Sequence, residues 1–551
     1  MFYPANFPTQ LEDSLIKLLQ LLEQGFEKKA PLDQKSMNRL LMDSLKLQKD
    51  FKAIKPSAWW LNFILIRHQS RFSSSFIKQI KQFLVKTKTR SLSGIVPLTL
   101  FTKGTGCPFS CVYCPNEPGM PKSYFSDEPA VMRAIRHHFD PFKQTLQRLV
   151  MFYLSGHSID KVEIIIKGGT FSFYKKQYRR WFVRRVFDAC NVDIEKYLKS
   201  GQIDYVKTVK TLFDSQKENE TAKSRIIGIN IETRPDYIND KELVYLRTLG
   251  VTHVEIGVQM PSNKIYFLIK RNHTVKQVMK ATSLLRSYGL KIGYHLMPNL
   301  PGTTPSLDLQ LMKEIFSNPW FKPDHLKLYP TTITTHTKLF EWFKNETYKP
   351  YSLDELIEII IKFKSEVVPP WVRIGRLTRD ITTDAMQIKQ FAPNLREIIQ
   401  KKMHDNNKIC SCIRCREIKD LKIVGKPYLH TISYNVSNGK EFFLEFTDDN
   451  KHSLGFIRLF IPHTQFALAK SLAGAALIRE LHVYGQVVPI GKKEKNTIQH
   501  HHFGIRLLKE AEKLSTKQGS NKIAIIAGVG TRKYYEKFGY NLIDTYMVKN
   551  I

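Results

Sequence analysis

Residues 107–114 read Cys107-Pro-Phe-Ser-Cys111-Val-Tyr-Cys114, and this short stretch decides the fold of the first large domain. Its C-x3-C-x2-C spacing places three thiolates on one loop, where they can hold three irons of a four-iron cluster. Such a cluster usually takes four cysteines, so one iron stays open, which is the requirement for binding and cleaving S-adenosylmethionine (SAM). A structural zinc loop is the alternative. The loop follows a predicted strand at 95–101 and precedes a strand–helix repeat, and this context favours the cluster.

Short apolar strands alternate with helical segments from residue 95 to about residue 375. The predicted strands after the cysteine loop are 162–166, 226–231, 251–256, 290–296 and 325–328. Such alternation predicts an α/β domain with a parallel sheet, open or closed as a barrel, whose chemistry lies at the carboxyl ends of the strands. The polar and glycine-containing positions at those ends are Gly168, Gly169, Glu232, Arg234 and Gln259.

A second domain, of the α+β class, is predicted at the C-terminal end. Its predicted strands are 442–446, 453–461, 481–488 and 523–527. A long amphipathic helix is predicted at 504–517, and a short helix follows at 532–538. We find no internal repeat and no extended low-complexity segment.

The segment between the two domains is rich in Lys and Arg and reads Cys410-Ser-Cys412-Ile-Arg-Cys415. Three clustered thiols predict zinc, which prefers four ligands, and the site is expected to be structural. His404 and His430 are the nearby candidates for a fourth ligand, although each also fits an ordinary surface histidine. The seven cysteines form two clusters and the single Cys190, which is not a disulfide framework. Such clusters usually bind metal in a reducing compartment, so we expect an intracellular, cytoplasmic protein.

The composition points to a polyanionic partner. The 551 residues include 85 Lys and Arg against 50 Asp and Glu, a formal charge of +35 that is spread over the chain. Nucleic acid is the first candidate partner, and a basic proteome or a membrane-facing surface is the alternative. No run of eighteen apolar residues and no secretory signal is present, so no membrane association is expected.

The first ninety residues are predicted to be mostly helical and to end in a basic stretch. That stretch either binds phosphate groups or forms a solvated linker, and the sequence leaves both interpretations open. The basic residues are Lys78, Lys81, Lys86, Lys88 and Arg90.

The cysteine motif matches the radical SAM superfamily, and longer motifs resemble one family within it, the catalytic subunit of Elongator. The resemblance covers roughly residues 80–551. The motifs that carry it are Lys122-Ser-Tyr-Phe-Ser-Asp-Glu-Pro-Ala-Val-Met-Arg-Ala-Ile-Arg, Asp160-Lys-Val-Glu163, Gly168-Gly-Thr-Phe171, Ile231-Glu-Thr-Arg-Pro-Asp-Tyr237, Glu255-Ile-Gly-Val-Gln259, Leu326-Lys-Leu-Tyr-Pro-Thr331, Val368-Pro-Pro-Trp-Val-Arg373, Arg479-Glu-Leu-His-Val-Tyr-Gly485 and Gly528-Val-Gly-Thr-Arg532.

The resemblance implies a radical SAM partial (β/α) barrel followed by an acetyltransferase domain of the GNAT superfamily. It implies a [4Fe-4S] cluster, SAM and acetyl-CoA as cofactors and cosubstrate. The implied activity starts a 5-carboxymethyl group on the wobble uridine of tRNA, uridine 34. tRNA and other Elongator-type subunits are the implied partners.

The resemblance also suggests which residues bind SAM. They lie at strand ends, where the glycines also fit an ordinary turn and the charged pair also fits a barrel-closing ion pair. The candidates are Gly168, Gly169, Glu232, Arg234, Gln259 and Arg271. Lys161 is implied to contact acetyl-CoA from the barrel side, and its alternative is a solvated lysine before a strand.

The GNAT fold holds the pyrophosphate of CoA with a Q/R-x-x-G-x-G/A loop at a helix start, through backbone amides and the helix dipole. Here the loop reads Gln499-His-His-His502-Phe503-Gly504, so His502 replaces the first glycine and puts tight binding in doubt. The strand residues Glu480, Leu481, His482 and Val483 are implied to pair with pantetheine. Tyr534 and Tyr535 are the implied catalytic residues near the thioester, or else pack the helix on the sheet.

We therefore expect four regions, with boundaries at residues 90, 380 and 425. They are a basic tRNA-binding region (1–90), the radical SAM domain (91–380), a linker with a zinc site (381–425) and the acetyl-CoA domain (426–551). Two alternatives remain open: a protein lysine acetyltransferase with a structural cluster domain, and a tRNA-binding scaffold that has lost acetyl transfer. The scaffold would have no need for an open iron.

Overall fold

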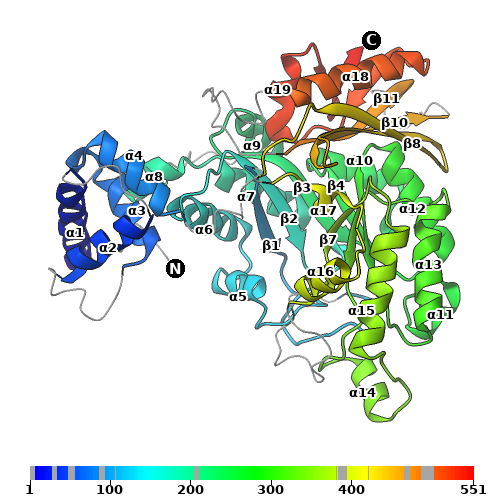
Figure 1. Cartoon of the computed structure of the whole chain (residues 1–551). Helices are drawn as coiled ribbons and strands as arrows, with labels where there is room; N and C mark the ends of the chain where they lie inside the picture. Colours follow the sequence, from blue (N-terminus) through cyan, green and yellow to red (C-terminus); the bar gives the residue numbers. More distant parts are fainter. Residues whose placement is uncertain are drawn as a thin grey trace.

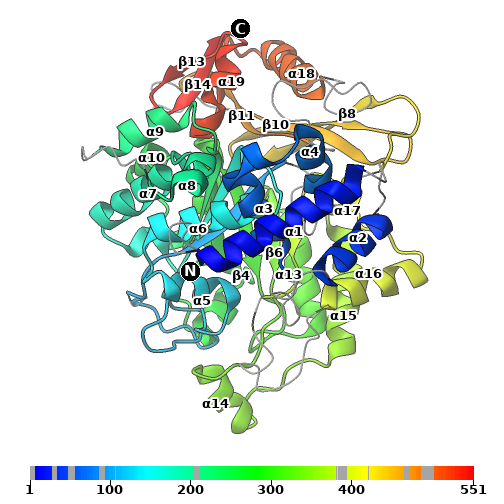
Figure 2. The ribbon, with the colours of Figure 1, turned by 90° about the vertical axis from the view of Figure 1, so that its left-hand side faces the viewer.

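The computed structural model contains two large domains and an N-terminal group of helices (Figure 1). The N-terminal helices lie beside the barrel, and the C-terminal sheet lies over one end of it, as the second view also shows (Figure 2). The structure describes residues 7–27, 34–46, 56–85, 94–105, 107–203, 210–379, 381, 394–419, 421–463, 472–484 and 502–551.

The first domain is built on a seven-stranded sheet in the order β1 to β7, in which every neighbouring pair is parallel. Its strands are β1 (Val96–Phe101), β2 (Lys161–Lys167), β3 (Arg225–Thr233), β4 (His253–Gln259), β5 (Lys291–Leu296), β6 (His325–Leu328) and β7 (Arg373–Arg376). Alternate residues on these strands are apolar and pack against the surrounding helices, as Val162, Ile164 and Ile166 do on β2. A parallel sheet of this order, covered by helices, is the predicted partial barrel, and the prediction is confirmed.

Helices cover the outer face of this sheet. The helices of the barrel domain are α5 (Pro129–Arg136), α6 (Pro141–Leu154), α7 (Lys176–Cys190), α8 (Ile194–Ser200), α9 (Leu212–Asn219), α10 (Asp240–Thr248), α11 (Asn263–Leu268), α12 (Val275–Ser287), α13 (Pro305–Ser317), α14 (Lys338–Lys344) and α15 (Leu353–Lys362). Many begin at a side-chain cap, such as Asp140 before α6 and Thr274 before α12, which fixes where the connecting loops end.

The N-terminal helices form a group of their own and pack on the barrel through α3, which contacts α6 and α8. Their bounds are α1 (Thr9–Glu27), α2 (Gln34–Lys46), α3 (Ala58–Arg67) and α4 (Ser74–Phe83). Leu15, Leu18, Leu19 and Leu22 of α1 are buried at helical spacing, so one face of this helix forms the core of the group.

The C-terminal domain is a separate mixed sheet in the order β13-β14-β12-β11-β10-β9-β8. Its elements are β8 (Tyr428–Val436), β9 (Gly439–Thr447), β10 (Ser453–Pro462), β11 (Ala475–Val483), α18 (Phe503–Lys517), β12 (Lys522–Ile525), α19 (Arg532–Glu536), β13 (Asn541–Ile543) and β14 (Tyr546–Asn550). Between the two domains lie α16 (Leu395–Asp405) and the short α17 (Ile413–Arg416). The predicted α+β domain after the barrel is therefore present, while the predicted boundaries at 90, 380 and 425 stay predictions.

A buried network of charges joins the two sheets. Arg479 of β11 donates to Asp324, just before β6, and to Glu441 of β9 at 2.6 Å. Glu441 also accepts from Arg286 of α12 at 3.1 Å, and Arg458 of β10 lies 3.5 Å from Asp324. These side chains are essentially inaccessible to solvent. Charges this deeply buried need partners, so the two domains depend on each other for pairing.

Among the described residues, no helix is long and apolar enough to cross a membrane.

Candidate functional site

A pocket opens at the carboxyl ends of the barrel strands, and all three cysteines of the first motif line it. The loop that carries Cys107, Cys111 and Cys114 is anchored by the amide of Val112, which donates to the carbonyl of Ile269 at 3.1 Å. A guanidinium nitrogen of Arg271 lies 3.6 Å from the sulfur of Cys111. The structure thus places three thiols and a cation at one end of the barrel.

Five of the six predicted SAM-binding residues line the same pocket. They are Gly169, Glu232, Arg234, Gln259 and Arg271. The Oε1 atom of Gln259 and one Nη of Arg234 are buried and have no hydrogen-bond partner among the described residues. Buried polar atoms without partners are rare in native proteins, so the Gln259 acceptor and the Arg234 donor are available to hydrogen-bond a ligand.

Gly168 is the sixth residue, and it does not line the pocket. Its φ is 134°, and a Cβ at this position would collide with Thr102. The glycine is therefore needed for close packing of two strand ends, whereas Gly169, with φ 93°, faces the pocket.

Glu232 and Arg234 do not pair with each other, so the barrel-closing ion pair between them does not form. Arg234 instead donates two hydrogen bonds to the carboxylate of Asp236, at 2.9 and 3.2 Å. Glu232 accepts from the hydroxyl of Tyr124 at 2.6 Å and from Lys327 at 3.2 Å. Burial alone raises the pKa of Glu232, but nearby ammonium groups outweigh burial and lower it to about 2.

Several pocket residues were missed from the sequence. Glu255, His295 and Lys167 line the pocket, and Lys327 contacts both Glu232 and Glu255. Glu255 and Lys327 lie within quoted family motifs, at strand positions that point to the barrel interior, and this alternation was the signal that could have identified them. Glu232, Glu255 and His295 offer ligand atoms close enough for a metal ion, but the ammonium of Lys327 already lies between the carboxylates.

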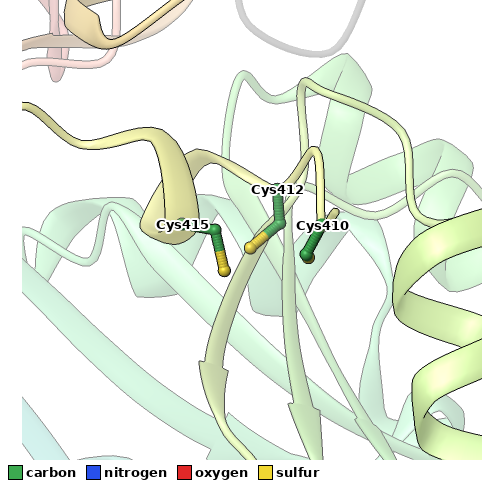
Figure 3. A group of neighbouring side chains, drawn as sticks. All are labelled: Cys410, Cys412 and Cys415. Atoms are coloured by element: carbon green, nitrogen blue, oxygen red, sulfur yellow. The ribbon is translucent and has the colours of Figure 1, made fainter. Parts of the chain in front are cut away.

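The second cysteine group lies between the domains (Figure 3). Cys415 comes from α17, and Cys410 and Cys412 come from the loop before it. Their sulfurs lie within 4.8 Å of one another, which is close enough to share one metal ion. No fourth His, Cys, Asp or Glu joins the group among the described residues, and His404 is 92% exposed and faces Asp405. The amine of Lys364 lies 4.0 Å from the sulfur of Cys415.

The strand predicted to bind pantetheine leaves one edge open. β11 pairs with β12 only over Ala475–Ile478, while its other edge pairs with β10 as far as Val483. Residues 479–483, which include the predicted Glu480, Leu481, His482 and Val483, therefore have no strand along one edge among the described residues. Their free backbone groups can pair with an extended ligand.

The start of α18 brings three predicted residues together. A Cβ on Gly504 would lie 3.3 Å from the hydroxyl of Tyr534 and 3.6 Å from Val483. His502 precedes the helix in the left-handed region, with φ 52° and ψ 28°, and Phe503 is buried in the core. Residues 499–501 of the predicted loop lie outside the described residues.

The two predicted catalytic tyrosines lie in different surroundings. Tyr534 is 39% exposed and borders Gly504, whereas Tyr535 is buried and its ring meets that of Tyr540 edge-on. Burial raises the pKa of both hydroxyls, so each is a neutral phenol at pH 7. Lys161 begins β2 beside Arg225, on which Gly530 of the C-terminal domain packs. The roles of these residues stay predictions.

Of the predicted tRNA-binding residues, Lys78 and Lys81 are exposed on α4. Lys86, Lys88 and Arg90 lie outside the described residues.

Comparisons with known proteins agree with this architecture. Residues 101–313 match the radical SAM superfamily, and residues 323–405 match the radical SAM C-terminal domain. The chain is 39% identical over 474 residues to the tRNA uridine(34) acetyltransferase of Dehalococcoides mccartyi, which covers 85% of this chain and 100% of that protein. It is 38% identical to human Elongator complex protein 3 over 84% of this chain and 85% of the human protein.

A solved structure has the same fold. The archaeal Methanocaldococcus infernus Elp3 with an N-terminal deletion (1–46) superposes with a TM-score of 0.71 at 36% identity, covering 84% of this chain and 100% of that one. The chain therefore belongs to the radical SAM family of the tRNA uridine(34) acetyltransferases and Elongator complex protein 3.

Proposed function

We propose that this chain modifies uridine 34 of tRNA, using SAM-derived radical chemistry and acetyl-CoA to start a 5-carboxymethyl group. The observation that supports the proposal most is that one chain holds both a pocket lined by three cysteines and a sheet of the kind expected for an acetyltransferase. The buried charge network holds these two domains together. Relatives named tRNA uridine(34) acetyltransferase match 85% of the chain.

The pocket residues fit a [4Fe-4S] cluster and SAM. Cys107, Cys111 and Cys114 would hold the cluster, and the positive charge of Arg271 beside Cys111 suits its thiolate ligands. The cluster, when bound, supplies the electron that splits SAM to a 5′-deoxyadenosyl radical. Gln259 and Arg234 offer an acceptor and a donor without partners among the described residues, which suit the ammonium and carboxylate groups of SAM. The pocket lies within the barrel end, where surrounding side chains restrict the access of water to a radical.

The open edge of β11 and the start of α18 suit acetyl-CoA. The backbone of Glu480–Val483 would pair with pantetheine, while Gly504 lets the phosphates approach the first turn of α18. Tyr534 borders this place and is the better placed of the two tyrosines for contact with the thioester. We propose zinc at Cys410, Cys412 and Cys415.

The remaining proposals concern partners and location. tRNA would bind the exposed lysines of α4 together with the basic stretch that follows. Other Elongator-type subunits are proposed as partners, and the cytoplasm as the location.

The geometry disfavours a protein lysine acetyltransferase. Such an enzyme needs an acidic general base, and Glu480 is the carboxylate on β11, the strand proposed to bind CoA. However, Arg458 donates to Glu480 at 2.8 Å, and the barrel residue Lys291 lies 3.5 Å away. Burial raises the pKa of Glu480, yet the surrounding cations lower it well below its usual range, which makes it a weak base.

The test is anaerobic reconstitution with iron and sulfide, followed by incubation with bulk tRNA, SAM, reductant and acetyl-CoA. Nucleoside mass spectrometry should then detect a modified wobble uridine. SAM cleavage without tRNA-dependent consumption of acetyl-CoA would contradict the proposal and favour the scaffold, for which the His502 substitution is the supporting observation.

A further inference from the structure

Aromatic side chains gather at the surface of the barrel domain, beside the rim of the pocket. Oγ1 of Thr170, a residue that lines the pocket, lies 3.9 Å from the sulfur of Cys107. A single turn of 3₁₀ helix, Phe171–Phe173, follows Thr170, and α7 begins three residues later. Phe173 is 40% exposed, and Trp181 of α7 is 38% exposed. Large apolar side chains that are accessible in one place mark a binding surface.

The rings form a row that leads outward from the strand ends. The ring centroids of Tyr174 and Tyr178 lie 5.2 Å apart, and those of Tyr178 and Trp181 lie 5.6 Å apart. Tyr178 and Trp181 are three residues apart on α7, so they share one face of the helix. Both lie in the first two turns of α7, near the carboxyl end of β2. We call Phe173, Tyr178 and Trp181 the aromatic platform.

Hydrogen bonds fix the platform to the segment that leads into the cysteine loop. The hydroxyl of Tyr174 donates to the carbonyl of Lys103 at 2.6 Å, and the amide of Lys103 donates to the hydroxyl of Tyr178 at 3.1 Å. The ammonium of Lys103 also lies 5.1 Å from the ring centre of Tyr178. Lys103 is four residues before Cys107, so the platform and the cysteine loop are held in a fixed relation.

Positive charge surrounds the platform. Helix α7 holds five basic residues against one acidic residue. Lys103, Lys175 and Arg180 are exposed around the rings. Single-stranded RNA matches such a surface, because each nucleotide offers a flat base for stacking and a phosphate for a cation. An apolar protein surface would leave the three cations without counter-charges.

The position of the pocket gives this surface a task. A base that reacts in a pocket must leave the stack of its own loop, and its neighbours then lose their stacking contacts. Aromatic side chains at the rim can accept a neighbouring base and replace the lost contacts. A platform at this place would therefore hold the loop open while the target base lies in the pocket.

We propose that the aromatic platform stacks an unpaired base next to uridine 34 in the anticodon loop, while Lys103, Lys175 and Arg180 contact the adjoining phosphates. The inference rests on the proposed function, because it takes tRNA as the substrate, and it adds the surface that orients the loop. Trp181 offers the largest ring of the platform, and Tyr178 supports it from one side.

The test measures, by fluorescence anisotropy, the binding of a synthetic anticodon stem–loop to the reconstituted full chain. A second stem–loop has abasic sites on both sides of uridine 34, so it keeps every phosphate and lacks the neighbouring bases. We expect Trp181→Ala to weaken binding of the intact stem–loop about tenfold and that of the abasic one less than about twofold, because no base remains to stack. Trp181→Phe should retain most of the affinity for the intact stem–loop.

Two further variants separate stacking from charge. Trp320→Ala changes a tryptophan that is 45% exposed in the connection between α13 and β6, at the opposite end of the barrel, and should bind both stem–loops as the wild type does. Arg180→Glu should weaken both stem–loops by the same factor and lower the salt dependence of binding, because both keep their phosphates.

A crosslink tests the wild type without any substitution that could disturb folding. Stem–loops with 5-bromouridine on either side of uridine 34 are irradiated in the complex, and the crosslinked peptide is identified by mass spectrometry. We expect a crosslink within residues 173–181.

Two results overturn the inference: an equal effect of Trp181→Ala on the intact and the abasic stem–loop, or crosslinks that map only outside residues 173–181. Modified uridine formed by a Trp181→Ala protein with unchanged binding would contradict the platform alone. Platform-dependent binding without any modified uridine would contradict the proposed function alone.

Discussion

His502 holds a backbone conformation that glycine adopts more easily than any other residue. We predict that His502→Gly raises the free energy of unfolding by up to about 1 kcal/mol, because the left-handed region is strained for residues with a Cβ. The substitution should also tighten acetyl-CoA, since it opens the phosphate site. Chemical denaturation and calorimetric titration measure the two effects.

Lys451→Gly is the matched control, because Lys451 has φ 62° in the turn between β9 and β10, away from α18. It should gain similar stability without any change in acetyl-CoA affinity. Equal affinity in His502→Gly and wild type would show that His502 does not narrow the site.

Cys111 is predicted to be a cluster ligand, and Cys190 is the buried thiol outside both clusters. Cys111→Ala should lose most of the iron taken up on anaerobic reconstitution, together with SAM cleavage, because two cysteines hold the cluster poorly. Cys190→Ala should keep both, although removing a buried sulfur from α7 costs about 1 kcal/mol of stability. Iron analysis and absorbance spectra distinguish the two variants, and full iron content in Cys111→Ala would refute the assignment.

Asp308 gives a pH-dependent contribution to stability. Burial raises its pKa to about 7, above the value near 3.8 for the unfolded chain, although Asn299, Tyr351 and Thr303 donate to it. Between pH 4 and 7 the folded protein therefore holds a proton that the unfolded chain has released, and stability falls as pH rises through this window. The slope is at most about 1.4 kcal/mol per pH unit.

Asp308→Asn should remove that slope, which urea unfolding at pH 5, 6 and 7 can measure as a difference from wild type. Parallel pH profiles for the two proteins would mean that the Asp308 carboxyl is ionised in the folded state.

Most strands with buried apolar faces were predictable from the sequence, whereas short or exposed strands were not. All six predicted barrel strands overlap observed ones, because each carries Val, Ile or Leu at alternate positions. β7, β8, β13 and β14 were missed. β7 has only four residues, and most side chains of β8 and all of those of β13 are at least partly exposed, whereas β14 lies between β13 and β12 with its first three side chains buried. β11 begins at Ala475 rather than at residue 481, because small alanines carry little strand signal.

The part of the site that lies in one short motif was predictable, because cluster chemistry determines the spacing of its cysteines. The part formed by residues from separate strands was not predictable. The cysteine motif identified the pocket, but Lys327 and His295 come from separate strands and meet Glu255 only in the folded barrel. The fourth ligand of the second cysteine group could not be predicted either, and none appears among the described side chains.

The exposed face of α4 holds Lys78 and Lys81, which are predicted to bind tRNA. Lys78→Glu combined with Lys81→Glu should weaken tRNA binding and lower the slope of log affinity against log salt by about 2, since each lysine neutralises about one phosphate. Filter binding at several salt concentrations measures the slope. Lys313→Glu, an exposed lysine on α13, is the charge control, and a similar slope in all variants would exclude α4 from the interface.

For the whole molecule, the buried network predicts that both domains unfold together. Asp324→Asn should lower the free energy of unfolding by about 3–5 kcal/mol, because it leaves Arg479 and Arg458 buried without their shared carboxylate. Calorimetry should show one transition at a lower temperature. Lys402→Gln, which breaks an exposed pair with Asp354, should change stability by less than about 1 kcal/mol. Two separate transitions in the wild type would show that the domains are independent.

The barrel sheet has an apolar outer face and a polar inner face. Packing against the helices rests on outward residues such as Val162, Ile164 and Ile166, whereas the inward charges of Glu232, Glu255 and Lys327 stabilise one another. Exchange of one inward charge leaves its partners buried without a counter-charge, so inward positions tolerate change only in matched combinations. The chemistry of the pocket would therefore evolve by two or three linked substitutions at a time, while the outward layer stays the same.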